Sequence, residues 1–273
     1  MIDIFNFLAA PIALAILLVG IHAYLGLHVL ERGVIFVDIS LAQVASLGSA
    51  ISLFHAHESN SRYGVFLSLG LCLLVALVLA LLRRFEKKTS QEALIGMTYA
   101  LASGALILVA DKLPHGAEHL KEALVGNILF VTWPVVLETF LVYAGVGVVH
   151  FIFRRQFWAC SQGKKMSFIW DFLFYLLFGV VITFSTRHAG VLVVFSILVV
   201  PAALASRFVA GVTRQLILAW GLGTIGILLA FLLTYKFDFP AGAGVVTTLT
   251  GGFFLTLMVK LIYETRFQKI KPS

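Results

Sequence analysis

The sequence predicts an all-α membrane protein, a bundle of about eight or nine transmembrane helices. Hydrophobic residues make up 60% of the 273 positions and charged residues only 12%, whereas ordinary soluble domains carry about a quarter charged residues. The charges also lie in short clusters between long apolar runs, which is typical of polytopic membrane proteins. No nucleotide-binding domain can be fitted beside these runs, so we expect residues 1–273 to form a single transmembrane domain.

Apolar runs of roughly the 20 residues that a bilayer requires recur along the whole chain. The predicted spans are 4–28, 34–54, 63–82, 92–110, 133–153, 167–186, 189–206, 215–235 and 241–262. The longest stretch between spans is 111–132, whose mixed, amphipathic composition argues against disorder. The start, MIDIFNFLAAP, lacks a positively charged n-region, so we predict no cleaved signal peptide.

The 20 Lys and Arg residues are divided unequally between the two sides of the predicted bundle. The sparse side holds only Arg62, Lys112, Lys121, Arg187 and Lys236. Because Lys and Arg gather on cytoplasmic loops, we place the N-terminus outside and the C-terminus in the cytoplasm. The net charge of +7 therefore reflects topology, and no basic face with interleaved aromatic residues indicates nucleic-acid binding. The chain has no G-x-x-x-x-G-K-[ST] loop either, so we expect it to hydrolyse no ATP by itself.

The stretch FVDISLAQVASLG, residues 36–48, places polar side chains within the apolar second span. At about 100° per residue, Asp38, Gln43, Ser46 and Ser49 share one arc with small residues, and Asp38 and Gln43 lie at its edges. Such an arc fits a helix that lines a substrate path. It equally fits a small-residue seam between helices, in which the polar side chains form interhelical hydrogen bonds. The spacing alone favours the packing seam slightly.

Histidines with neighbouring carboxylates occur twice on the predicted outer side. In LPHGAEHLKEAL, residues 113–124, His115 and His119 are four positions apart and would share a face in a helix. His55 and His57, followed by Glu58, form the second group. Imidazole and carboxylate together suit zinc or another late first-row divalent ion. Neither group has the tight spacing of a structural zinc site, so ordinary solvated loop residues are the alternative.

Three further sequence features lie on or near the predicted inner side. The connection ASRFVAGVTRQ, residues 205–215, carries Arg207, Phe208 and a central Gly211, and is either a plain turn or a docking element for a cytoplasmic partner. Pro201 lies deep in the seventh span and should kink it, because proline removes a backbone hydrogen bond. The basic stretch 153–166 is predicted as a loop that contains Cys160, and with Cys72 in an apolar run it indicates no disulfide framework.

Four stretches resemble, in the same order, the permease subunits of the ABC transporters that import zinc, manganese or iron. They are EALIGMTYALASG (92–104), LVGNIL (124–129), GVLVVFSILVVPAALA (190–205) and DFPAGAGVV (238–246). The resemblance implies a type II ABC importer in a bacterial inner membrane. Its partners would be a second, identical permease subunit, cytoplasmic ATP-binding subunits and an extracytoplasmic metal-binding protein. It further implies that 205–215 is the coupling helix and that the arc from Asp38 to Ser49 lines the translocation path.

The second span departs from the family's pattern, which is Leu-Ser-His-Ala-x-x-Pro-Gly with an Asp shortly before it. When the segment is aligned on Gly48, Gln43 takes the His position and Leu47 the Pro position. An amide oxygen binds zinc less well than imidazole does and prefers harder ions. The resemblance implies a divalent metal ion as the transported substrate, zinc first and manganese or iron next, with no permanently bound cofactor. The alternatives are an ATP-independent secondary transporter or channel, or an ABC permease for a chelate such as haem or cobalamin.

Overall fold

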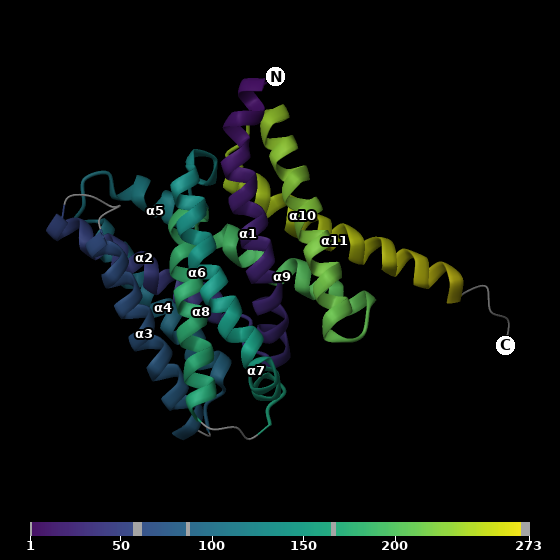
Figure 1. Ribbon diagram of the computed structural model, residues 1–273, viewed down its shortest axis with the longest axis horizontal. Coiled ribbons are helices and arrows are strands. Elements are labelled where there is room, and N and C mark those ends of the chain that lie inside the picture. The colour runs from purple at the N-terminus through teal and green to yellow at the C-terminus, as the bar shows by residue number, and fades with distance from the viewer. Residues whose placement is uncertain (1, 57–61, 86–87, 165–167, 269–273) are drawn as a thin grey trace.

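The computed structural model describes residues 2–56, 62–85, 88–164 and 168–268, which fold into a bundle of helices (Figure 1). The helices are α1 (Ile2–Arg32), α2 (Val37–Ala56), α3 (Arg62–Phe85), α4 (Gln91–Ala110), α5 (Gly116–Val125), η1 (Ile128–Phe130), α6 (Trp133–Ile152), α7 (Arg154–Ser161), α8 (Phe168–Ala189), α9 (Val191–Phe208), α10 (Val212–Phe237) and α11 (Ala241–Gln268). These ranges contain no strand. The all-α prediction is therefore confirmed for the described part of the chain.

Nine helices of the described residues are long and apolar enough to cross a membrane, namely α1–α4, α6 and α8–α11. Each corresponds to one predicted span, with ends that differ by a few residues. The agreement arises because a run of apolar residues about 20 long is a local property of the sequence. The first eight spanning helices form the bundle, and α11 leans away from it (Figure 1).

Two connections are more ordered than the sequence suggests. The stretch 111–132 contains α5 and η1, and the predicted basic loop 153–166 contains α7, whose Phe157, Cys160 and Ser161 are buried. The prediction that Cys160 lies in a loop is therefore wrong. Cys160 and Cys72 are both buried and unbridged, as expected.

The segment 205–215 is not a separate helix but a connection between two helices, and its role in coupling stays a prediction. Helix α9 continues to Phe208 and α10 starts at Val212, which leaves a turn of Val209, Ala210 and Gly211. Gly211 has φ +92°, a backbone conformation that other residues rarely adopt. Pro201 is buried inside α9, and the helix continues past it, so the kink stays a prediction.

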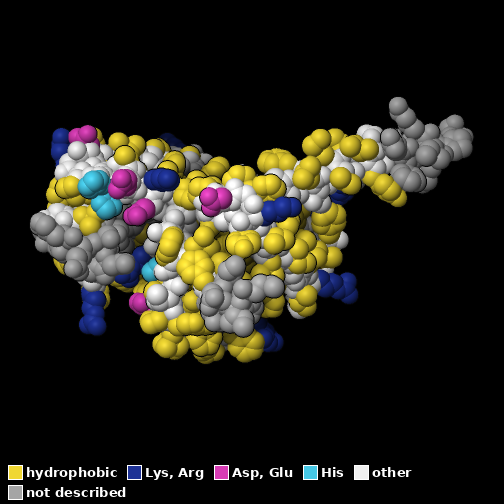
Figure 2. Space-filling view, turned by 90° about the horizontal axis from the view of Figure 1, so that it is seen from above, with side chains coloured by type: hydrophobic (Ala, Val, Ile, Leu, Met, Phe, Trp, Pro, Cys, Tyr) yellow, Lys and Arg dark blue, Asp and Glu magenta, His cyan; other side chains and the backbone are white. Residues whose placement is uncertain are grey.

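The two ends of the bundle differ in character. We call the end that carries the start of α1 and α5 the N-terminal end, and the opposite end, with α7 and the α9–α10 turn, the basic end (Figure 1). The basic end carries five exposed cationic side chains, namely Arg154, Arg155, Lys164, Arg207 and Arg214. Seen from above, the N-terminal end shows His side chains next to Asp and Glu side chains (Figure 2).

Close helix contacts fix the position of α2 within the bundle, where it packs against α3, α4 and α8. At Gly48 the backbones of α2 and α3 approach so closely that a Cβ would lie 2.6 Å from Cα of Ser68. The Ser68 hydroxyl donates a hydrogen bond to the carbonyl oxygen of Ala45 (2.7 Å) across the same seam. Small residues thus let α2 sit inside the bundle with its polar arc enclosed.

Candidate functional site

Asp38 and Gln43 are buried residues whose side-chain oxygens have no hydrogen-bond partner among the described residues. Their residues are 0% and 4% exposed. Neither carboxylate oxygen of Asp38, nor Oε1 of Gln43, makes a hydrogen bond among the described residues. The packing alternative requires interhelical hydrogen bonds at these positions, and those bonds are missing for these three oxygens. Since buried polar atoms are normally paired, a ligand that supplies the missing interaction fits these oxygens better than packing does.

Glu92 adds a second carboxyl group near the start of α2, and nothing in the sequence had singled it out. Its Oε1 accepts a hydrogen bond from the backbone N–H of Phe36 (3.2 Å), two residues before Asp38. Its Oε2 is buried and unpaired among the described residues. In the sequence, Glu92 is visible only as an acidic residue at the start of the fourth predicted span. Acidic residues are common there because they interact favourably with a helix N-terminus.

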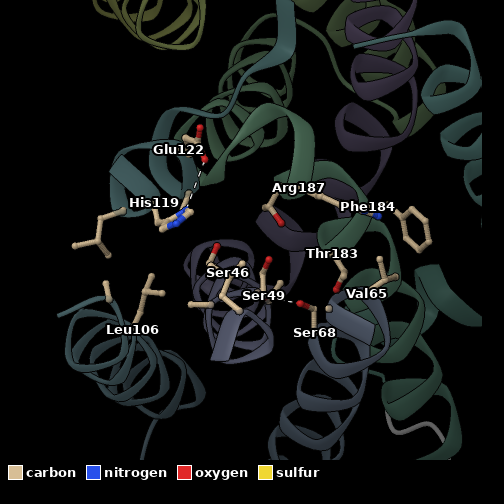
Figure 3. Close-up of a pocket in the computed structure, with 18 residues that line it drawn as sticks. Ser46, Ser49, Val65, Ser68, Leu106, His119, Glu122, Thr183, Phe184 and Arg187 are labelled. Atoms are coloured by element: carbon tan, nitrogen blue, oxygen red, sulfur yellow. Dashed lines mark hydrogen bonds and ion pairs between the residues drawn. The ribbon is translucent and has the colours of Figure 1, made fainter. Parts of the chain in front are cut away.

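A cavity of about 140 Å³ lies at the N-terminal end of the bundle, among α2, α3, α4, α5 and α8. We call it the upper cavity. Figure 3 shows Ser46 and Ser49 of α2 between the α5 side chains and those of α3 and α8. The polar side chains that line it are Ser46, Ser49, Ser68, His119, Glu122, Thr183, Thr186 and Arg187. The tertiary structure thus brings predicted path residues of α2 together with one of the predicted outer metal contacts.

The four predicted path residues lie at two depths. Ser46 and Ser49 line the upper cavity, whereas Asp38 and Gln43 do not. At about 1.5 Å rise per residue, Ser46 is roughly 4.5 Å beyond Gln43 along the helix axis and about 12 Å beyond Asp38. The cavity lining extends along α2 as far as Ala45, about 3 Å from Gln43 along the helix axis, and includes neither Gln43 nor Asp38.

The predicted outer histidines do not share a helical face. His115 has φ +60° and precedes the first helical residue of α5, so its side chain does not follow the helix register of His119. Each forms a separate pair, His115 Nδ1 with Glu118 (3.6 Å) and His119 Nδ1 with Glu122 (3.9 Å). Only His119 lines the upper cavity, where its side chain is 33% exposed.

Metal ligands are not preassembled in the part of the chain that the structure describes, because no group of three His, Cys, Asp or Glu side chains is arranged to hold an ion. Of the second predicted group, His57 lies outside the described residues, and only the backbone of His55 is described. Arg187 and Glu122 place side chains of opposite charge at the upper cavity. Arg187 had been noted only as a charge outside the spans.

The α9–α10 turn presents Arg207 and Phe208 at the surface of the basic end. Phe208, the last residue of α9, is 51% exposed, and its ring centroid lies 5.8 Å from Nζ of Lys260. The Gln215 side chain donates a hydrogen bond to the carbonyl oxygen of Val209 (3.1 Å) and so braces the turn from α10. An exposed aromatic and a cation on a rigid turn form a suitable contact for a protein partner.

Comparisons with known proteins agree on one family. The sequence profile of the ABC 3 transport family matches residues 4–260. A "Probable metal transport system membrane protein" of Chlamydia trachomatis is 26% identical over 64% of this chain, and the matched part spans 62% of that relative. The "High-affinity zinc uptake system membrane protein ZnuB" of Haemophilus influenzae is 26% identical over 93% of this chain and 97% of its own length.

Two further comparisons concern a manganese transport protein and a solved structure. The "Manganese transport system membrane protein MntC" of Listeria monocytogenes is 20% identical over 93% of this chain and 91% of that protein. Among solved structures, a chain of "PsaBC from Streptococcus pneumoniae in complex with Fab" superposes with a TM-score of 0.74 at 20% identity, covering 93% of both chains. That structural likeness supports the fold alone.

Proposed function

Because the chain belongs to the ABC 3 transport family, we propose that it is the membrane subunit of an ABC importer that moves a divalent metal ion into the cytoplasm. The observation that carries the metal assignment is the buried, unpaired carboxylate of Asp38. A cation passing along α2 would supply the interaction that the described residues do not. The chain itself would hydrolyse no ATP, since it contains no phosphate-binding loop.

We propose zinc as the transported ion, with manganese and iron as the alternatives that experiment must separate. The imidazole of His119 at the upper cavity and the similarity to a zinc uptake protein support zinc. The α2 side chains Asp38, Gln43 and Ser46 offer oxygen donors only, which suit manganese better. The similarity to a manganese transport protein is the second observation in favour of that ion.

The path in this proposal runs from the upper cavity, past Ser49 and Ser46, to Gln43 and Asp38. The upper cavity would receive the ion from an extracytoplasmic metal-binding protein, with His119 and Glu122 as its first contacts. The segment of the path between the upper cavity and Asp38 would become accessible when the ATP-binding subunits rock the permease. A coupled cycle requires the ion and ATP to favour different conformations, because a ligand shifts an equilibrium only through differential affinity.

The basic end would face the cytoplasm, in accordance with the distribution of Lys and Arg, and the chain would lie in the inner membrane of a bacterium. Arg207, Phe208 and Gly211 would then form the contact with the ATP-binding subunit, as an exposed turn instead of a helix. A second, identical permease subunit would complete the importer.

Metal accumulation in a strain that lacks the chain tests this function. Cells carrying the chain, its ATP-binding subunit and its binding protein should accumulate radioactive zinc, and unlabelled manganese and iron should compete less well than unlabelled zinc. Uptake by the purified chain in liposomes without any ATP-binding subunit would instead establish a secondary transporter or channel. Uptake of haem or cobalamin without metal uptake would establish a chelate permease.

A further inference from the structure

A larger cavity lies at the basic end and takes no part in the path described above. Its volume is about 410 Å³, and it lies among α1, α7 and the start of α10. Its walls include His28 of α1, Arg154, Arg155 and Trp158 of α7, Lys164 just beyond α7, and Val212 of α10. We call it the basic cavity. Because α7 does not span the bundle, the basic cavity opens beside the helix ends and not along a transmembrane path.

The charge of the basic cavity is of one sign. Arg154, Arg155 and Lys164 contribute three cations, and none of its lining residues is acidic. The planar guanidinium of arginine matches the oxygens of a phosphate group and donates two parallel hydrogen bonds to them. The remaining walls are largely aromatic or aliphatic, from Trp158 and Val212. A ligand of this cavity would therefore combine a phosphate with an apolar portion.

Buried contacts hold α7 in this orientation. The Phe157 ring stacks on the His150 ring of α6, with centroids 4.1 Å apart. Ser161 Oγ accepts a hydrogen bond from Nε of Arg32 (3.0 Å), and the Cys160 thiol donates one to Asp171 (2.9 Å). The inner face of α7 is thus tied to three neighbouring helices, and its Arg154–Arg155 pair is left exposed.

Packing contacts also hold His28 and Trp158, which line the basic cavity. His28 is 1% exposed, and its Nδ1 lies 2.8 Å from Ser161 Oγ. The Trp158 ring packs edge-on against the His28 ring at 5.1 Å. Tryptophan at the end of a membrane bundle is typical of the headgroup region, where one side of the ring is apolar and the other is wet. An aromatic wall beside three cations favours a membrane lipid over a soluble anion as the ligand of this cavity.

We propose that the basic cavity binds the headgroup of an anionic phospholipid, with its phosphate between Arg154, Arg155 and Lys164. The glycerol and first acyl carbons lie against Trp158 and Val212. Basic pockets between transmembrane helices on the cytoplasmic side bind anionic headgroups in this way. Val212 directly follows the α9–α10 turn, so the bound lipid also supports this turn, which itself follows Phe208. The proposal uses the orientation given under "Proposed function" but does not depend on which ion is transported.

Native mass spectrometry of the full chain in detergent tests the proposal, with phosphatidylglycerol and phosphatidylcholine titrated separately. The first phosphatidylglycerol should bind at least about ten-fold more tightly than phosphatidylcholine. The double substitution R154Q/R155Q should weaken phosphatidylglycerol binding by about 25-fold, since each arginine near an anionic lipid contributes a factor of about five. R207Q/R214Q removes the same charge from the same end outside the cavity and should leave the affinity unchanged.

Lys164→Gln provides a milder variant, because Lys164 is an exposed side chain beyond the last residue of α7. It should weaken phosphatidylglycerol binding by about five-fold without disturbing the packing of α7. Equal binding of the two lipids, or an equal loss in both double variants, would refute a specific site and leave only diffuse surface attraction. Displacement of phosphatidylglycerol by an equal concentration of glycerol 3-phosphate would overturn the lipid assignment in favour of a soluble anion.

Discussion

Replacing Asp38 with leucine should stabilise the folded chain while it abolishes metal uptake. Asp38 is 0% exposed, and both carboxylate oxygens lack partners among the described residues. Each buried unsatisfied polar atom costs about 1–3 kcal/mol, so the two oxygens together cost roughly 2–6 kcal/mol. Leucine has the same branched shape and no polar atoms, and the greater bulk of its methyl groups offsets about 1–3 kcal/mol of this gain. For a chain of this length 1 kcal/mol corresponds to about 2–4 °C in Tm, so we expect Tm to rise by a few °C.

Asp171→Leu is the matched control, because it makes the same chemical change at a paired aspartate. Asp171 Oδ1 lies 2.9 Å from Nη1 of Arg32, whose side chain is 0% exposed. Leucine at this position would leave the arginine buried without its partner, and such a loss costs about 3–5 kcal/mol. The two Asp→Leu substitutions should therefore shift Tm in opposite directions.

Thermal unfolding in detergent, followed by tryptophan fluorescence, measures the two Tm values. Radioactive zinc uptake in the complemented strain measures function. A fall in Tm for Asp38→Leu comparable to that of Asp171→Leu would show that Asp38 holds the fold together through contacts. Undiminished uptake by Asp38→Leu would remove Asp38 from the path, whatever its effect on stability.

Three other substitutions test the packing, the ion selectivity and the upper cavity. Gly26→Ala should lower Tm by about 2–12 °C, because overpacking costs about 1–3 kcal/mol. The added Cβ would clash with the backbone oxygen of Leu198 and lie 3.0 Å from Cβ of Ala202, both in α9. Gly20→Ala in the same helix, with nothing within 4 Å, is the control and should not lower it. Gln43→His should shift competition uptake towards zinc over manganese, since imidazole is the softer donor; unchanged selectivity would return Gln43 to a packing role. His119→Ala should raise the KM for uptake several-fold and His115→Ala should leave it unchanged, because only His119 lines the upper cavity; equal effects would contradict this.

The membrane fold could be predicted from the sequence because its signal is local. Each span is a continuous run of apolar residues, and the bilayer sets its length whatever the neighbouring helices do. The short helices α5 and α7 gave no such signal. They are 10 and 8 residues long, and an isolated helix of that length is marginal without tertiary contacts. For α7 those contacts come from α1, α6 and α8.

The candidate site could be predicted only in part. The helical wheel placed Ser46 and Ser49 on one arc, and both line the upper cavity. The same reasoning failed at His115, because its backbone adopts φ +60° before the helix starts. Glu92 and Arg187 were missed as site residues, since their roles depend on contacts with α2 that lie far away in the sequence.

The sequence by itself determined that the chain is an all-α membrane bundle, with its spans and its asymmetric charge, because hydropathy and charge are summed along the chain. The tertiary structure decided which polar groups meet. It leaves the carboxylate of Asp38 unpaired among the described residues, whereas it pairs Asp171 with Arg32. Both are single aspartates near the start of an apolar span, and the sequence does not distinguish them. The physical reason is that the free energy of a buried charge depends on the groups within a few ångströms of it, and those groups come from other helices.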